Sequence, residues 1–157
     1  MSNYILDLRK LVGHKTLIQC AASIIVVDEK GHMLLGKRND NHMLGYFGGS
    51  VEIDEKVEDC AIRELFEETG IIANKIEFFC INSGPETHYI YPNGDEVSNI
   101  EIVYICKKYH GELSDSNEMT ELKFYDINDI DINNISPPIR NVVKKYIDSV
   151  KNLSHHD

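Results

Sequence analysis

The residues with the clearest chemical potential are the carboxylates that lie between the glycine pair Gly48–Gly49 and Gly70. The segment from about Glu55 to Thr69 is predicted to be a helix, with Asp54 as its N-cap and Gly70 as the left-handed residue that ends it. Each helical residue advances by about 100° around the axis. By that rule a set of carboxylates shares one narrow arc of the helix, namely Glu64, Glu67 and Glu68.

A bound cation would explain this arc better than a solvated acidic surface, which is the structural alternative. Like charges three or four residues apart destabilise a helix by about 0.2–0.5 kcal/mol per pair. The helix dipole also disfavours anions in the last turn, where Glu67 and Glu68 lie. A divalent cation removes both costs because it neutralises the cluster. Since every candidate ligand is an oxygen, we expect Mg²⁺ or Mn²⁺, with Ca²⁺ as a further alternative.

The spacing of this acidic run also matches a known motif. Gly49, five residues, Glu55, seven residues and then the segment Arg63–Ile71 (RELFEETGI) fill every fixed position of the Nudix box. The chain therefore resembles the Nudix (MutT-like) hydrolase family. The resemblance implies an enzyme that uses a divalent metal and water to cleave a phosphoric anhydride bond in a nucleoside diphosphate linked to another group.

The resemblance also assigns roles to the residues of the box. The expected metal ligands are the backbone carbonyl of Gly48 and the side-chain carboxylates of Glu64, Glu67 and Glu68. Arg63 and Glu55 are expected to pair with each other and to orient the glutamates that bind metal. The alternative for Arg63 is an ordinary surface ion pair, which would contribute little to stability.

The general base has more than one candidate. Glu64 could take the proton from water, but many family members use a glutamate on a loop that follows the hairpin strands. Glu118 and Glu121 are the loop candidates in this chain, and Glu112 is a more distant one. We favour Glu118 because Glu121 begins an expected strand. Each of the two loop candidates has the alternative of being a solvated charge without a catalytic role.

The substrate pocket should contain an exposed aromatic surface on which a base can stack. The expected contacts are Tyr46, Phe47, Gly49 and Tyr89, with Tyr91, Phe124 and Tyr125 as further aromatic candidates. Each aromatic residue has the alternative of packing in the core or in the hairpin. Phe47 stands where the family commonly has proline, and this departure could change the wall of the pocket.

The substrate itself stays open between an ADP-ribose-like sugar nucleotide and a (deoxy)nucleoside triphosphate. Pro85 and Tyr89 lie near the positions that mark ADP-ribose-cleaving and dinucleoside-polyphosphate-cleaving members of the family, but neither spacing matches. A hydrolase of dinucleoside polyphosphates or of RNA 5′ ends is therefore an alternative. Another is a catalytically silent Nudix domain that senses nucleotides. That version usually lacks glutamates of the box, and this chain keeps them all.

Hydrophobic periodicity predicts the elements that must position these residues. Helices are predicted over 3–12 and 137–150, and strands over 17–28, 32–37, 75–82, 87–91, 97–106 and 121–125. The Asn93–Gly94 pair predicts a hairpin, and a helical turn is expected over 126–130. This order indicates an α/β fold, which matches the Nudix-type α/β/α sandwich with a mixed β-sheet and a loop-helix-loop catalytic motif.

The chain of 157 residues is expected to form one Nudix hydrolase domain over residues 1–157, with residues 151–157 as a frayed tail. Its net charge of −10 argues against broad binding to nucleic acids or to anionic membranes. The sequence has no C-x-x-C pair, no long apolar run and no signal-peptide core, so we expect a cytoplasmic protein. The expected partner is a small nucleotide, and analogy with the family allows a homodimer through the Asn93–Gly94 hairpin.

Overall fold

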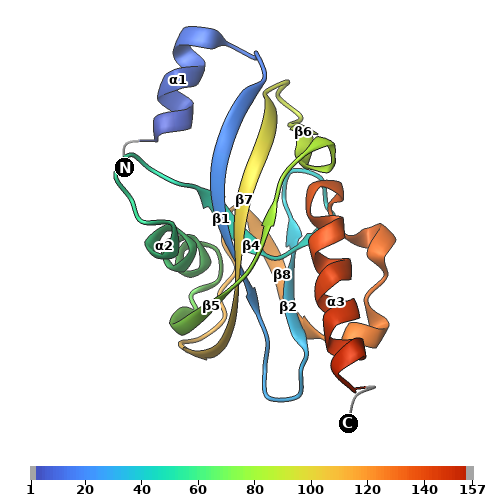
Figure 1. Ribbon diagram of the computed structural model, residues 1–157. Coiled ribbons are helices and arrows are strands. Elements are labelled where there is room, and N and C mark those ends of the chain that lie inside the picture. Colours follow the sequence, from blue (N-terminus) through green and yellow to red (C-terminus); the bar gives the residue numbers. More distant parts are fainter. Residues whose placement is uncertain (1–2, 155–157) are drawn as a thin grey trace.

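The computed structural model describes residues 3–154, and a five-stranded mixed sheet forms its centre (Figure 1). One of its two interior strands is β1 (Leu17–Val26), which is buried over most of its length. It pairs in parallel with β7 (Glu96–His110) and antiparallel with β4 (Phe47–Ser50). The opposite edge of β7 pairs antiparallel with β5 (Ile72–Asn82) and β6 (His88–Ile90).

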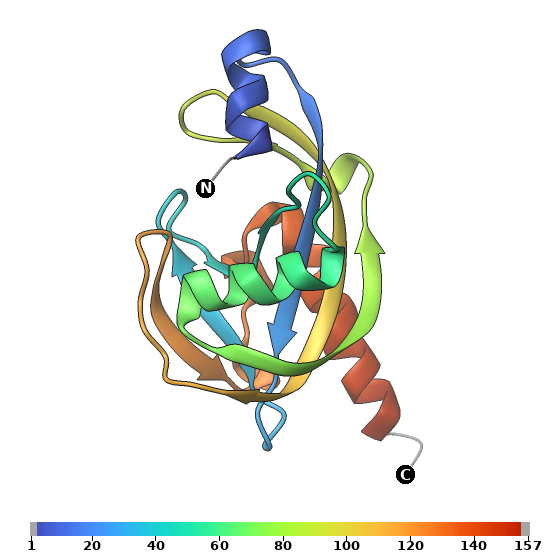
Figure 2. The same ribbon diagram turned by 90° about the vertical axis from the view of Figure 1, so that its left-hand side faces the viewer.

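A smaller sheet lies beside the first one. In it β2 (Met33–Arg38) is placed between β3 (Leu44–Gly45) and β8 (Met119–Tyr125). Figure 1 shows the two sheets between α2 (Val57–Thr69) and α3 (Arg140–Ser154), and Figure 2 shows α2 lying across β1 on the side away from α3. The predicted α/β/α sandwich with a mixed sheet is confirmed.

The start of α2 differs from the prediction. The helix begins at Val57 rather than near Glu55, and Lys56 occupies the N-cap position without a side-chain hydrogen bond. Asp54, the expected N-cap, has a left-handed backbone with a φ of 64°. The reason is a turn before the helix, which the N–H of Glu55 closes by donating to the carbonyl of Glu52 at 3.1 Å. Asp54 lies inside that turn and therefore cannot cap the helix.

The end of α2 is as predicted. Gly70 has a φ of 80°, and its N–H donates to the carbonyl of Phe66 at 2.9 Å. The helix buries Cys60, Ala61 and Leu65 in the core that it shares with the sheet. Because these residues occupy its inner surface, the glutamates of the helix lie along the side that faces β4 and the solvent.

The expected hairpin joins β6 to β7 and turns between Tyr91 and Asp95. The N–H of Gly94 donates to the carbonyl of Tyr91 at 2.9 Å, and the N–H of Tyr91 donates to the carbonyl of Asp95 at 2.8 Å. Gly94 has a positive φ of 92° and Asn93 does not, so the turn is a three-residue loop rather than a two-residue Asn-Gly turn. The hairpin brings Tyr89 and Tyr91 to a cavity of the same chain. A homodimer through this hairpin stays a prediction.

Both ends of the described chain are helical. α1 (Tyr4–Val12) is capped by the Asn3 side chain, and Arg9 ties it to the hairpin by donating to the carbonyl of Glu96 at 2.6 Å. α3 continues through Ser154, so the prediction of a frayed tail is wrong for residues 151–154. No glycine or proline follows Val150 to stop the helix. The rest of the expected tail, residues 155–157, lies outside the described residues.

Short 3₁₀ helices complete the chain, and they are η1 (Pro85–Thr87), η2 (Ile127–Asp129), η3 (Ile132–Asn134) and η4 (Pro137–Ile139). The second of them is the helical turn that was predicted over 126–130, and the last leads directly into α3. Within residues 3–154, no helix combines the length and the apolar character needed to cross a membrane.

Gly70 and Gly31 provide a matched test of the packing at the end of α2. Both have a positive φ, of 80° and 79°, so alanine at either position carries a left-handed cost of about 1–2 kcal/mol. A Cβ on Gly70 would also lie 2.6 Å from the carbonyl oxygen of Glu112, whereas a Cβ on Gly31 would meet no atom within 4 Å. We expect Gly70→Ala to reduce the free energy of unfolding in urea by at least about 1 kcal/mol more than Gly31→Ala. Equal losses would mean that the loop after β7 yields to the new methyl group without cost.

Candidate active site

A cavity of about 420 Å³ opens where β4, α2 and the start of β8 meet, and we call it the acidic cavity. Its walls carry the carboxylates of Glu64 and Glu68 from α2 and of Glu118 from the residue before β8. Gly48 and Gly49 of β4 form another part of the wall. The structure therefore brings Glu64 and Glu118 to one cavity although they are far apart in the chain.

Glu68 is the most deeply buried of these carboxylates, with 5% of its surface exposed. It accepts one long hydrogen bond, from the backbone N–H of Gly48 at 3.3 Å. Burial raises the pKa of Glu68 well above its usual value, and the nearby charges of Glu64 and Glu118 raise it further. A buried carboxylate with so little compensation is a position at which a cation would be bound favourably.

Glu64 lines the same cavity and accepts a hydrogen bond from Arg63. The Nη1 of Arg63 donates to Oε1 of Glu64 at 2.9 Å, while its Nε and Nη2 donate to the two carboxylate oxygens of Glu55 at 2.8 and 3.0 Å. The hydrogen bonds from Arg63 lower the pKa of Glu55 to about 2, so Glu55 is a fixed anion. Burial raises the pKa of Glu64, and the charge of Arg63 opposes that rise. The expected pairing of Arg63 with Glu55 is present, and it fixes the side chain that orients Glu64.

Glu67 lies apart from this pair. Both of its oxygens lie 3.4 Å from Nη1 of Arg63, its side chain is 40% exposed, and it does not line the acidic cavity. In the part of the chain that is described, no three acidic, histidine or cysteine side chains are gathered closely enough to hold a metal. Glu67 follows Arg63 by four residues, which is about one helical turn and places its carboxylate beside that guanidinium. A role for Glu67 as a metal ligand stays a prediction that requires its side chain to turn.

The donor set nevertheless fits a hard divalent cation. Glu64 and Glu68 present carboxylate oxygens to one cavity, and both have their pKa raised by burial. Oxygen-only sites of this kind suit Mg²⁺ or Mn²⁺. A cation between these carboxylates would remove the repulsion that their burial creates.

The glycine pair of β4 is required by close packing on both of its sides. A Cβ on Gly49 would lie 2.4 Å from the carboxyl carbon of Glu64 and within 2.6 Å of both of its oxygens. A Cβ on Gly48 would lie 2.1 Å from the hydroxyl oxygen of Ser23, its neighbour across the sheet. Any larger residue would therefore displace either the carboxylate of α2 or the side chain of β1.

The candidates for the general base occupy different places. Glu118 lines the acidic cavity, and its backbone carbonyl accepts from the N–H of Asn39 at 2.9 Å. Glu121 lies on β8 with a left-handed φ of 52°, pairs with Lys37 at 3.6 Å and does not line the cavity. Glu112 packs its carbonyl near Gly70 and also lies outside the cavity lining. The geometry agrees best with Glu118, whose role stays a prediction.

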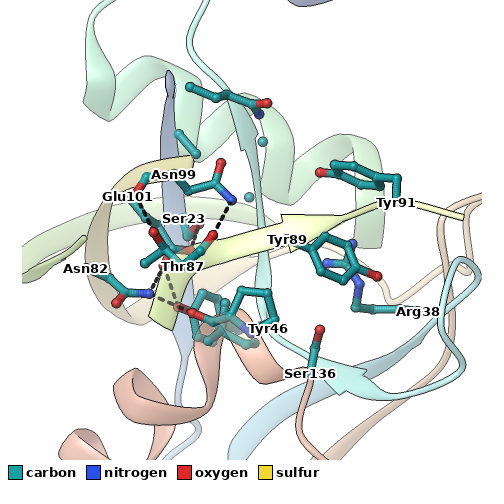
Figure 3. A pocket seen from close by; sticks show the side chains of 16 residues that line it. Ser23, Arg38, Tyr46, Asn82, Thr87, Tyr89, Tyr91, Asn99, Glu101 and Ser136 are labelled. Atoms are coloured by element: carbon teal, nitrogen blue, oxygen red, sulfur yellow. Dashed lines mark hydrogen bonds between the residues drawn. The ribbon is translucent and has the colours of Figure 1, made fainter. Parts of the chain in front are cut away.

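A second cavity, of about 100 Å³, adjoins the first, and we call it the tyrosine cavity. The two share wall residues, which are Gln19, Arg38, Gly48, Gly49 and Tyr91. Figure 3 shows Tyr89 and Tyr91 on one side of the tyrosine cavity and a hydrogen-bonded group around Glu101 on the other. The two tyrosine rings pack edge to face with their centroids 4.9 Å apart.

Arg38 stands where the two cavities meet. Its Nε and Nη2 donate to the two oxygens of Asp40 at 2.9 and 2.7 Å, which fixes the guanidinium in one orientation. The hydroxyl of Tyr89 lies 3.4 Å from Asp40 and accepts from the side-chain amide of Asn41 at 3.1 Å. A cationic group is therefore held between an acidic site and an aromatic site.

The expected substrate contacts separate into two groups. Tyr46, Gly49 and Tyr89 line the tyrosine cavity. The prediction for Phe47 is wrong, because its side chain is fully buried in the hydrophobic core and lines neither cavity. Tyr46 lies in the connection between β3 and β4 rather than in a strand, and its hydroxyl donates to Glu101 beside the tyrosine cavity. The replacement of the common proline by Phe47 therefore changes the core rather than the pocket wall.

Some cavity residues were missed from the sequence, and they are Arg38, Asp40, Asn82 and Glu101. Glu101 carried a signal, because it is the charged residue of the otherwise uncharged run Ile100–Ile105. Burial raises its pKa, while hydrogen bonds from Ser23, Asn82 and Tyr46 lower it. Arg38, Asp40 and Asn82 carried no such signal, because polar residues near the ends of strands are usually exposed to solvent.

Comparison with known proteins identifies relatives. A family model described as the NUDIX domain matches residues 18–146. The "ADP-ribose pyrophosphatase" of Methanocaldococcus jannaschii is 32% identical over 133 residues, which are 82% of this chain and 75% of that protein. The "NAD-capped RNA hydrolase NudC" of Vibrio vulnificus is 30% identical over 105 residues, or 65% of this chain, and the match spans 36% of its own length.

Solved structures share the architecture. The MutT NUDIX hydrolase from Burkholderia pseudomallei superposes with a TM-score of 0.68 at 22% identity, over 82% of this chain and 97% of that one. The MutT protein from Bacillus halodurans gives a TM-score of 0.66 at 23% identity, over 82% of each chain. At these identities the likeness shows the fold alone.

Gly49→Ala tests whether the close approach of β4 to α2 positions Glu64. The new methyl group must push the Glu64 carboxylate away, so we expect Mn²⁺ affinity measured by calorimetry to fall about 10–100-fold. Gly45→Ala is the matched control, because a Cβ there would have its nearest neighbours at 3.5 Å, an ordinary contact. Unchanged Mn²⁺ binding by a folded Gly49→Ala protein would show that Glu64 is not part of a cation site.

Proposed function

The chain belongs to the NUDIX domain family, and from this premise we propose that it is a metal-dependent pyrophosphohydrolase of a small nucleotide. The observation that carries the proposal is the junction of two different sites at Arg38. One site gathers carboxylates that suit a cation and a phosphate-linked reaction. The adjoining site has aromatic walls that suit a nucleoside. A nucleotide has the same two parts, a charged pyrophosphate and a flat base.

The reaction is the attack of water on a phosphorus atom of the pyrophosphate. A new bond forms between the water oxygen and phosphorus, the bridging phosphorus–oxygen bond breaks, and the two phosphate products leave. Glu118, at the edge of the acidic cavity, accepts the proton that water loses. Arg38 donates to phosphate oxygens and holds the substrate across the junction, and Asp40 keeps the guanidinium in place.

A divalent cation is the cofactor of the proposed reaction, and Mg²⁺ or Mn²⁺ suits the oxygen donors. Glu64 and Glu68 would hold it, with Glu67 and the Gly48 carbonyl as further ligands after a turn of the Glu67 side chain. When bound, the cation neutralises phosphate charge and makes water more acidic. Arg63 keeps Glu64 in position through its bidentate pair with Glu55.

The preferred substrate class is an ADP-ribose-like sugar nucleotide. The relative from Methanocaldococcus jannaschii, whose match covers 82% of this chain, is named an ADP-ribose pyrophosphatase. The nucleoside part enters the tyrosine cavity beside Tyr89 and Tyr91, and the pyrophosphate extends past Arg38 into the acidic cavity. (Deoxy)nucleoside triphosphates are the second choice. Relatives named for RNA substrates exist, but the net charge of −10 gives long nucleic acids no electrostatic support.

A panel of nucleotides tests this proposal. With Mg²⁺ or Mn²⁺ we expect hydrolysis of ADP-ribose to AMP and ribose 5-phosphate, measured by chromatography of the products. Chelation with EDTA should abolish turnover, and added metal should restore it. Glu67→Gln should lower turnover at least about 100-fold if this residue joins the metal ligands. A folded protein that hydrolyses none of the nucleotides would instead favour the catalytically silent sensor.

Glu118→Gln and Glu121→Gln form a matched pair that tests the base. We expect Glu118→Gln to lower kcat by about 10²–10⁴, because the amide cannot accept the proton from water. Glu121→Gln should leave kcat within about a factor of three, since it removes only an exposed ion pair with Lys37. If neither variant slows the reaction, the base lies in the box helix and Glu64 becomes the candidate.

A further inference from the structure

Glu101 is a buried carboxylate whose environment calls for an explanation. It lies in β7 with 7% of its surface exposed, and it lines the tyrosine cavity without lining the acidic one. An ionised carboxylate is costly to bury unless charged or polar partners compensate it. Its hydrogen-bond partners are neutral side chains that all donate to it, an arrangement that favours the ionised carboxylate. Within residues 3–154 no ion pair with Glu101 is present.

The neutral partners come from different elements and converge on Glu101 (Figure 3). Its Oε1 accepts from the hydroxyl of Tyr46 at 2.9 Å and from Nδ2 of Asn82 at 3.0 Å, and its Oε2 accepts from the hydroxyl of Ser23 at 2.6 Å. Asn82 is itself fixed because it also donates to the carbonyl of Pro138 at 2.9 Å. An ionised carboxylate offers about four acceptor positions. Three donors therefore leave one acceptor position, on Oε2.

The register of the sheet turns Glu101 toward the cavity. Glu101 is opposite Ala21, and Asn99 is opposite Gln19, across the parallel pair of β7 and β1. All four of these residues line the tyrosine cavity, whereas the residues between them do not. Alternate residues of a strand share a face, so this face forms the floor of the cavity. The carboxylate lies on that floor, across from the tyrosines of the hairpin.

The arrangement of charge orients a ligand in the cavity. Arg38, at the junction with the acidic cavity, attracts phosphate, while the anionic floor at Glu101 repels it. A nucleotide can satisfy both groups only if its phosphates lie at the junction and a neutral hydrogen-bond donor reaches the floor. A carbonyl oxygen at that point would face Oε2 acceptor to acceptor and leave both unpaired.

We propose that Glu101 determines substrate specificity by accepting, on Oε2, a hydrogen bond from an N–H or O–H donor of the nucleoside. This inference rests on the proposed function. The donor is either an exocyclic amino group of the base or a hydroxyl of the nucleoside ribose. Glu101 takes no part in the chemical step, so its effect falls on the choice among substrates.

Glu101→Gln is the sharpest variant because the network dictates the orientation of the new amide. Nδ2 of Asn82 can only donate, so the amide oxygen of the new side chain must occupy the Oε1 position. Its NH₂ group then occupies the Oε2 position, where it can donate to the hydroxyl oxygen of Ser23. The variant keeps the hydrogen bonds that join the strands and removes only the acceptor that faces the ligand.

The experiment compares kcat/KM for the best substrate with kcat/KM for analogues that each lack one donor. One arm removes the exocyclic amino group, and the other removes the 2′ or 3′ hydroxyl of the nucleoside ribose. In the wild-type protein we expect the loss of the contacted donor to lower kcat/KM about 10–100-fold. In Glu101→Gln that loss should shrink below about threefold. The arm in which the preference shrinks identifies the base or the sugar as the source of the donor.

Glu77→Gln is the control, because Glu77 is an exposed residue of β5 whose carboxylate lies 3.9 Å from Lys75 of the same strand. It should keep the wild-type preference. Equal preferences in wild type and Glu101→Gln would overturn the proposal. The proposal would also be overturned if the wild-type protein did not prefer the full substrate over either analogue. That measurement does not depend on whether the variant folds. Turnover without preference refutes only the role of Glu101, whereas no turnover of any nucleotide refutes the proposed function as well.

Discussion

Repulsion among carboxylates that face one cavity is the constraint on which the rest of the site depends. Glu64, Glu68 and Glu118 all line the acidic cavity, and burial raises the pKa of the first two. The protein compensates them unequally. Glu64 receives a short hydrogen bond from Arg63, whereas Glu68 receives one long bond from a backbone N–H. Compensation is therefore weakest at Glu68, the more buried of the two, and a cation beside its carboxylate gains most there.

The compensation of Glu64 depends on a second anion. Arg63 binds Glu55 in bidentate fashion, and Glu55 in turn accepts from the backbone N–H of Glu52 at 3.1 Å. This chain of contacts anchors the guanidinium to the turn that precedes α2. The same turn holds Asp54 in a left-handed conformation, which explains why the helix starts later than its sequence suggests. Local geometry before the helix is thus set by what the arginine must hold, rather than by helix capping.

The sequence predicted what is local and missed what the sheet brings together. The box helix, its end at Gly70, and the hairpin follow from spacing within a few residues, and all are present. The layered α/β/α fold followed from the order of elements. Glu101 and Ser23 are 78 residues apart and meet only because β7 pairs in parallel with β1. A pairing of that kind leaves no periodic signal in either segment.

Two further differences have the same origin. Phe47 was assigned to the pocket because it is aromatic and adjoins the glycine pair, but the alternation of β4 sends its side chain into the core. Glu67 was placed with Glu64 and Glu68 because the three share an arc of the helix, yet Arg63 is close enough to draw it aside. Helical angles define which side chains can meet. Which partner each side chain contacts depends on charged groups that are positioned by other parts of the fold.

The two cavities share one rigid support, and this explains how a site assembled from distant segments keeps its geometry. On one side, the N–H of Gly48 donates to Glu68; on the other, Gly48 packs so closely on Ser23 that no Cβ fits between them. Ser23 in turn donates to Glu101 at 2.6 Å. Buried carboxylates of both cavities are therefore positioned by neighbouring residues of two paired strands, β1 and β4. A displacement of Gly48 cannot alter one cavity without altering the other, so the distance between the cation site and the floor of the tyrosine cavity is set by the sheet rather than by flexible loops.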